Sequence, residues 1–164
     1  MLGLAAQWLG VNQTQANSVA PILISEEQGR HKSTFCRMLM PPQLARYYSD
    51  NLKLTAQGNP ERLLAEMGLL NMDEFDKFGA QKMPLLKNLM QMSSLNICKA
   101  YQKNFRSLPR IASFIGTSNR TDLLCDPTGS RRFICIEAEH DIDCTGIEHS
   151  QIYAQLKEEL LAGA

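Results

Sequence analysis

The sequence lacks three features that would each indicate a broad class of protein. It has no net charge, with 17 basic and 17 acidic residues, so any contact with nucleic acid requires a local basic patch. It has no run of about 18 apolar residues and no basic start typical of a signal peptide. Its five cysteines include no Cys-x-x-Cys pair, which argues against a disulfide framework or a zinc ribbon. We therefore expect a soluble, cytoplasmic protein with no membrane partner.

One group of metal-ligating residue types remains, made of Cys135, His140, Cys144 and His149. Its spacings fit no common zinc pattern. Scattered buried thiols and surface histidines are the preferred interpretation, and no metal is expected at these four positions.

The chain is long enough for one α/β domain over 1–164, burying roughly two thirds of the surface that its unfolded chain exposes. Short apolar runs typical of buried strands alternate with amphipathic segments typical of helices. Strands are expected over 20–24, 47–50, 69–76, 111–119 and 131–137. Helices are expected over 2–9, 32–39, 60–67, 84–92 and 149–161. In segment 94–108 basic and aromatic residues interleave, and a protruding hairpin is predicted there.

A polar turn follows the first expected strand and leads into Lys32-Ser33-Thr34, which opens a helix. Strand, polar loop and helix in this order resemble a nucleotide-binding P-loop, whose usual spacing is Gly-x-x-x-x-Gly-Lys followed by Ser or Thr. Glu26 and His31 stand at the two glycine positions. The lysine and the hydroxyl of the motif are therefore present, and its glycines are not. A simple helix start is the alternative interpretation.

Polar residues also follow the third and fourth expected strands. Asp73-Glu74 ends the third and Asn119 ends the fourth. Doubly wound sheets bind ligands at the carboxyl ends of their strands, so these residues are expected to meet Lys32 and Ser33. Lys32 can pair with outer phosphates, Ser33 and Asp73 can hold Mg²⁺ and its water shell, Glu74 can act as a base on water, and Asn119 can orient that water. A solvated strand end and a turn-forming asparagine are the alternatives.

Four segments carry a resemblance to a known family: 29–35, 69–75, 109–119 and 126–133. They resemble the P-loop domain of the virulence-associated E proteins, including the Bacteroidetes branch, which are predicted ATPases of phages and mobile elements. These proteins are similar to superfamily 3 helicases and primase-helicases of the AAA+ class, and the resemblance covers about 20–161. It implies a three-layer P-loop NTPase core of five mainly parallel strands. Numbered in chain order, the strands are predicted to lie in the order 5-1-4-3-2.

The resemblance also assigns roles in binding and hydrolysing ATP with Mg²⁺. Lys32 and Ser33 match Walker A, Asp73 and Glu74 match Walker B, and Asn119 matches the first sensor. The expected phosphate-binding segment comprises Gly29, Arg30, His31, Lys32, Ser33 and Thr34.

Arg131 or Arg132 matches an arginine finger, which would reach the nucleotide of a neighbouring subunit in a homo-oligomeric ring. A solvated strand start, or an ion pair with Asp122 or Asp126, is equally compatible with these two arginines. The expected hairpin matches the one that tracks nucleic acid in such helicases, through Lys99, Lys103 and Arg106. Protection of a sheet edge is the alternative role for its basic residues.

The altered loop leaves enzymatic activity open. A non-glycine residue at positive φ costs about 1–2 kcal/mol, which makes His31 a handicap. A Glu26 carboxylate about 5 Å from a phosphate charge would cost roughly 3 kcal/mol, unless its side chain turns to solvent. The leading expectation is an ATPase module of a mobile-element primase-helicase, and the chain is expected to be a fragment of a longer protein. The alternative is a non-hydrolysing P-loop domain that serves as an assembly or DNA-binding scaffold.

Overall fold

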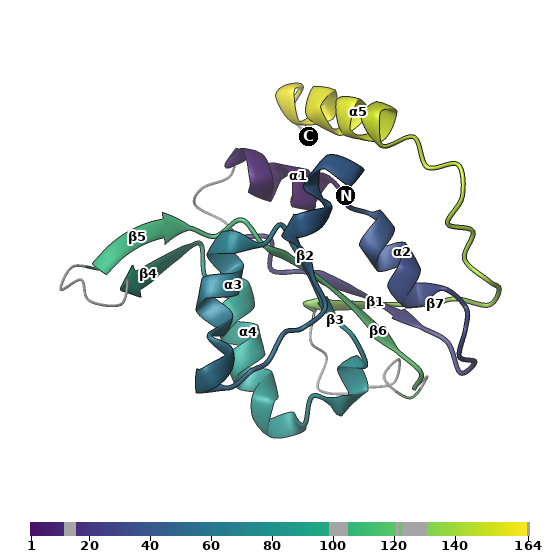
Figure 1. Cartoon of the computed structure of the whole chain (residues 1–164), viewed down its shortest axis with the longest axis horizontal. Helices are drawn as coiled ribbons and strands as arrows, with labels where there is room; N and C mark the ends of the chain where they lie inside the picture. The colour runs from purple at the N-terminus through teal and green to yellow at the C-terminus, as the bar shows by residue number, and fades with distance from the viewer. Residues whose placement is uncertain (12–15, 99–104, 121, 123–130, 164) are drawn as a thin grey trace.

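The fold is an α/β sandwich built on a parallel sheet (Figure 1). The structure, a computed structural model, describes residues 1–11, 16–98, 105–120, 122 and 131–163. The sheet runs in the order β2-β3-β6-β1-β7, and each neighbouring pair of strands is parallel. Its strands are β1 (Ala20–Ile24), β2 (Tyr48–Ser49), β3 (Leu69–Met72), β6 (Ser113–Ser118) and β7 (Phe133–Glu137). These are the five strands expected from the sequence, and from the β7 edge the order is β7-β1-β6-β3-β2.

Helices cover both faces of this sheet. The α-helices are α1 (Leu2–Leu9), α2 (Lys32–Met38), α3 (Pro60–Glu66), α4 (Met83–Gln91) and α5 (His149–Leu161). Short 3₁₀ helices connect them: η1 (Pro42–Tyr47), η2 (Ala56–Gly58), η3 (Phe75–Lys77) and η4 (Ala80–Lys82). In Figure 1, α1 and α2 lie on one side of the sheet, α3 and α4 on the other, and α5 lies outside α1.

Alternation along the strands supplies a core on each face. Ile22, Leu70 and Met72 point to the face under α3 and α4, where they pack with buried leucines of those helices. Leu23 and Ile115 belong to the opposite cluster, under α1 and α2. The sheet is thus apolar on both sides, as expected for parallel strands between two helical layers.

Several expected boundaries were wrong. The third strand ends at Met72 rather than continuing to Asp76, because Glu74 adopts a left-handed backbone (φ 52°) that no strand accommodates. The second strand is only two residues long, since η1 occupies the chain up to Tyr47. The fourth and fifth strands begin two residues later than expected.

The expected hairpin is confirmed. Strands β4 (Ser94–Cys98) and β5 (Phe105–Pro109) pair antiparallel and form a separate sheet. Figure 1 shows this hairpin projecting from the body of the domain. Lys99 and Lys103, two of the expected nucleic-acid contacts, lie outside the described residues. No described helix is long and apolar enough to cross a membrane.

Arg110 is a charged residue inside the core, only 1% exposed. Its guanidinium donates to the carbonyls of Ala112 (2.8 Å), Met90 (2.5 Å), Met92 (3.2 Å) and Asn17 (2.6 Å). Two of these carbonyls lie at the carboxyl end of α4, where a positive charge is favourable. Burial lowers the pKa of Arg110 to about 10, which still leaves it protonated at neutral pH. This side chain joins α4, the start of β6 and the segment before β1.

Candidate functional site

The loop between β1 and α2 contains two residues with a left-handed backbone. Gly29 has φ 85° and His31 has φ 59°, both in the left-handed region. A Cβ on Gly29 would meet no atom within 4 Å, so backbone conformation rather than space favours glycine there. His31 adopts the left-handed conformation without glycine's freedom and directly precedes Lys32, the first residue of α2.

Lys32 is buried and held by three oxygen atoms. Its Nζ donates to Ser25 Oγ (2.5 Å), to Asn119 Oδ1 (2.9 Å) and to the Glu27 carbonyl (3.3 Å). Burial lowers the pKa of Lys32, the nearby charge of Arg30 lowers it further, and Asp73 acts in the opposite direction. The amine is thus fixed between the β1–α2 loop and the carboxyl end of β6.

Asp73 connects the carboxyl ends of β3 and β6 to α2. Its Oδ1 accepts hydrogen bonds from Ser33 Oγ (2.8 Å) and Thr117 Oγ1 (2.6 Å). The Thr117 hydroxyl also accepts from the backbone N–H of Glu74 (3.3 Å). Thr117 was missed by sequence reasoning, although its place two residues before Asn119 on a strand that ends at the site was a usable signal.

Glu74 follows Asp73 in a left-handed turn and forms an ion pair. Its Oε2 accepts from Lys77 Nζ at 2.6 Å, and both side chains are largely exposed. The next carboxylate, Asp76, accepts from Ser118 Oγ (2.7 Å), which ties the turn to β6.

A cavity of about 440 Å³ opens where these residues meet, and we call it the carboxyl-end cavity. Three neighbouring strands, β1, β6 and β3, end at it. It is lined by Gln28, Gly29, Arg30, His31, Lys32, Ser33, Thr34, Asp73, Glu74, Thr117, Ser118 and Asn119. The expected Walker A, Walker B and sensor residues therefore line one cavity. Glu26 is exposed, outside this lining.

The oxygen atoms around Ser33 and Asp73 are a suitable partial ligand set for Mg²⁺. Hydroxyl and carboxylate oxygens are hard ligands, and Mg²⁺ is usually bound by one or two carboxylates together with substrate phosphates and waters. Within the part of the chain that the structure describes, no group of three or more His, Cys, Asp or Glu could hold a metal by itself. A magnesium ion at Asp73 would therefore depend on phosphate oxygens.

A second cavity, of about 650 Å³, lies between α1 and the base of the hairpin. Its two largest polar side chains already have partners: Trp8 Nε1 donates to the Gly68 carbonyl (3.0 Å), and Arg110 donates to four carbonyls. The Trp8 ring also stacks on Tyr153. The smaller carboxyl-end cavity is the better candidate because its ammonium, hydroxyl and carboxylate groups converge.

The two candidate finger arginines lie elsewhere. Arg131 and Arg132 precede β7, at the amino end of a strand parallel to β1. They therefore lie at the amino ends of the strands, on the opposite side of the sheet from the carboxyl-end cavity of their own chain. Asp122, one of their possible partners, forms an ion pair with Arg120.

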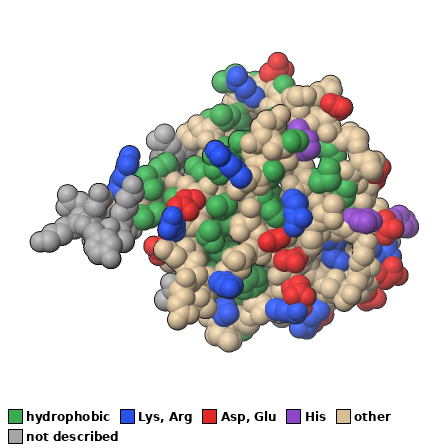
Figure 2. Space-filling model, in the orientation of Figure 1, with side chains coloured by type: hydrophobic (Ala, Val, Ile, Leu, Met, Phe, Trp, Pro, Cys, Tyr) green, Lys and Arg blue, Asp and Glu red, His purple; other side chains and the backbone are tan. Residues whose placement is uncertain are grey.

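Arg106 is exposed on β5 and is the one expected nucleic-acid contact among the described residues. On the face shown in Figure 2, basic and acidic side chains are interspersed, without a continuous basic patch.

The segment from 138 to 148, which we call the strap, runs beside the β1–α2 loop. Arg30 donates to the Glu139 carbonyl (2.5 Å) and to Glu27 Oε2 (2.7 Å), while its own carbonyl accepts from the N–H of Ile142 (3.3 Å). The side chain of Arg30, a residue of the expected phosphate-binding segment, therefore holds the strap to the loop in this structure. Sequence reasoning missed the strap.

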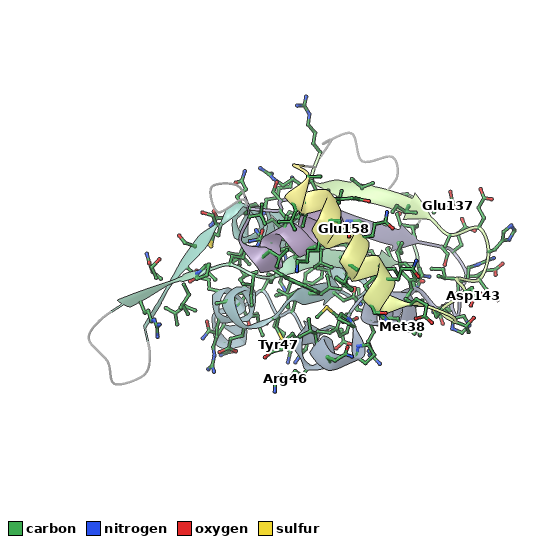
Figure 3. All side chains as sticks on the ribbon, turned by 90° about the horizontal axis from the view of Figure 1, so that it is seen from above. Met38, Arg46, Tyr47, Glu137, Asp143 and Glu158 are labelled. Atoms are coloured by element: carbon green, nitrogen blue, oxygen red, sulfur yellow. The ribbon has the colours of Figure 1, made fainter. Side chains whose placement is uncertain are left out.

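The beginning of α5 holds the other end of α2. His149 Nε2 lies 2.6 Å from the Met38 carbonyl, and the Tyr153 hydroxyl donates to the Leu39 carbonyl (2.7 Å). These carbonyls have no partner within the helix at its carboxyl end, so α5 satisfies them. Figure 3 shows Met38 beside the start of α5, with Glu137 and Asp143 on the path that leads to it.

A five-stranded parallel sheet with this convergence at its carboxyl ends is compatible with a P-loop-like core. The family described as "Virulence-associated protein E-like domain" matches residues 10–164, and the chain belongs to this family. No curated protein in the comparison matches the chain.

Solved structures of the C-terminal region of NrS-1 share the fold. Its apo structure (305–718) aligns with a TM-score of 0.56 and 21% identity, and the A form apo structure with 0.55 and 22%. These alignments cover 99% and 95% of this chain but 41% and 37% of the NrS-1 chains. The chain thus spans well under half the length of those structures.

Proposed function

We propose that this chain is the P-loop ATPase module of a phage or mobile-element replication protein, and that it couples Mg-ATP hydrolysis to DNA replication or remodelling. The observation that carries the proposal is the convergence of Lys32, Ser33, Asp73, Glu74 and Asn119 on the carboxyl-end cavity. Membership of the virulence-associated protein E-like family and the shared fold of the NrS-1 region support it.

The β1–α2 loop would bind the phosphates. Backbone N–H groups at the start of α2 and the Lys32 ammonium supply donors and positive charge to the same side of the cavity. Lys32 already donates to Ser25 and Asn119, so it needs only to exchange a neutral partner for a phosphate oxygen. Its burial strengthens that interaction, since electrostatic attraction is larger where water is excluded.

Ser33 and Asp73 would hold Mg²⁺, which, when bound, neutralises charge on the phosphates. Thr117 orients the Asp73 carboxylate by donating to the same oxygen as Ser33. Glu74 would accept a proton from the attacking water, and Asn119 would orient that water.

The proposed DNA contact is the β4–β5 hairpin. It projects from the body of the domain, and Arg106 is exposed on it. Arg131 and Arg132 lie at the amino ends of the strands, whereas the cavity of their own chain lies at the carboxyl ends. A finger role for either arginine would therefore require a neighbouring subunit.

Turnover of ATP by the isolated chain, with magnesium and single-stranded DNA, tests the proposal. Lys32→Ala is expected to remove phosphate binding. Glu74→Gln is expected to lower the rate about 100-fold or more, because a general base contributes at least that much. Lys157→Ala, on the exposed side of α5, is a matched control for the loss of a lysine. Rates unchanged in both site variants would contradict the proposal.

A non-hydrolysing P-loop scaffold is the second candidate. It is favoured by the residues at the two glycine positions, Glu26 and His31, and by the strained backbone of His31. Titration with labelled ATP and magnesium separates the two functions. A scaffold would show no ATP binding, or binding without hydrolysis. An ATPase would both bind and hydrolyse ATP.

A further inference from the structure

The ion pair at Glu74 bears directly on the base that the proposed function requires. A carboxylate that takes a proton from water must offer an oxygen to that water. In this structure Lys77 donates to Oε2 of Glu74 at 2.6 Å. One oxygen of the proposed base is therefore already engaged by an ammonium group.

The turn that carries both side chains is anchored on each side. Phe75 is buried in the core, and Asp76 accepts a hydrogen bond from Ser118 at 2.7 Å. The backbone N–H of Lys77 donates to the Glu74 carbonyl (2.8 Å), which closes η3. The backbone thus holds Lys77 within reach of Glu74, while both side-chain tips remain accessible to solvent.

We propose that Lys77 is a positioning residue that restrains Glu74, and that loss of the ion pair raises the rate of ATP hydrolysis. This inference rests on the proposed role of Glu74 as the general base. The Lys77 ammonium competes with water at Oε2 and holds the Glu74 side chain towards Lys77, so loss of the ion pair frees both carboxylate oxygens for the attacking water. Both partners are more than half exposed, at 52% and 68%, which makes the exchange of Lys77 for water easy and its effect on the rate modest.

The first test compares steady-state hydrolysis at saturating Mg-ATP. Lys77→Met is expected to raise kcat about two- to fivefold, the effect that an exposed ion pair supports, and to leave KM unchanged. Lys77→Arg retains the ion pair and is expected to behave as the wild type. Lys157→Met is the charge-matched control on α5.

Salt provides a readout that a purely structural role of Lys77 would not affect. Raising the ionic strength from about 50 mM to about 300 mM screens an exposed ion pair, so wild-type kcat should rise towards that of Lys77→Met. The difference between the two proteins should therefore shrink as salt increases. A kcat of Lys77→Met equal to or below that of the wild type, with the same salt response, would overturn the inference.

A second measurement does not depend on hydrolysis. The hydrogen bond to Glu74 raises the pKa of Lys77, with smaller contributions from Glu74's charge, Asp76 and Asp73. A titration followed by the ¹³Cε chemical shift of Lys77 should therefore give a lower pKa in Glu74→Gln than in the wild type. Equal pKa values would refute the ion pair and the inference with it. If the pKa falls but neither wild type nor Lys77→Met hydrolyses ATP, the proposed function fails, and the inference that rests on it fails with it.

Discussion

His31 is one of three non-glycine residues with a left-handed backbone in the described part of the chain. A side chain at φ 59° costs about 1–2 kcal/mol relative to glycine, although short polar and imidazole side chains tolerate this region better than most. The structure nevertheless retains the left-handed turn before Lys32. The loop therefore forms a left-handed turn at His31 although this residue is not glycine.

This predicts an order of stability among variants of His31. His31→Ala should be less stable than His31→Gly by about 1 kcal/mol, because alanine is strained at positive φ and glycine is not. Asn tolerates the left-handed region, so His31→Asn should remain near the wild type. Urea unfolding measures these differences, and an alanine variant as stable as the glycine variant would show that the left-handed turn is not formed.

Arg110 leads to a larger stability prediction. Arg110→Met removes the donors of four buried carbonyl hydrogen bonds, and the unfolding free energy should fall by about 3–5 kcal/mol. Arg110→Lys keeps the charge but cannot reproduce the planar fork, so it should lie between methionine and the wild type. Thermal or urea unfolding of the three proteins provides the measurement, and a methionine variant of wild-type stability would contradict this role.

At the scale of elements, the strap and α5 hold both ends of α2. Arg30 and Ile142 act at its amino end, and His149 and Tyr153 act at its carboxyl end. The helix that begins with Lys32 is therefore fixed by residues more than 100 positions further along the chain.

Tyr153→Phe tests one of these contacts. Loss of the hydroxyl leaves the Leu39 carbonyl without its donor and should lower stability by about 1 kcal/mol. Burial raises the pKa of Tyr153 to about 12, so the hydroxyl stays protonated at ordinary pH. Tyr47→Phe is a matched control because the Tyr47 hydroxyl pairs with the exposed Arg46. Faster amide exchange at the end of α2 is expected only in Tyr153→Phe, and equal exchange in both variants would contradict the contact.

The sequence revealed the elements with strong local patterns. The buried run before the β1–α2 loop, the basic hairpin and the polar residues at strand ends all carried a local signal. Arg110 carried none, because arginine in a sequence indicates an exposed side chain, and its burial depends on four carbonyls from three segments of the chain. The strap was missed for a similar reason: its hydrogen bonds to Arg30 follow no periodicity.

At the scale of the whole molecule, neutrality hides an uneven distribution of charge. Residues 137–164 contain seven acidic residues and one lysine, so the rest of the chain holds 16 basic and 10 acidic residues. Nucleic acid should therefore approach the hairpin rather than the strap and α5.

Arg106 provides the test of that orientation. Arg106→Ala should weaken binding of single-stranded DNA of any sequence and reduce the slope of log K against log salt by about 0.7, the value for one phosphate contact. Lys157→Ala, in the acidic region, should leave both affinity and slope unchanged. Fluorescence anisotropy across a salt series measures both, and equal losses in the two variants would contradict the assignment of the hairpin.

The proposed function requires that the carboxyl-end cavity bind a nucleoside triphosphate with magnesium. Calorimetric titration of the chain with a slowly hydrolysed ATP analogue tests it most directly, in the wild type and in Lys32→Ala, with and without Mg²⁺. We predict saturable binding at one site in the wild type, weakened about 10- to 100-fold by Lys32→Ala, as expected for loss of a charged hydrogen bond, and weakened again without magnesium. Absence of binding to the wild type, or equal affinity in both proteins, would contradict the proposed ATPase function.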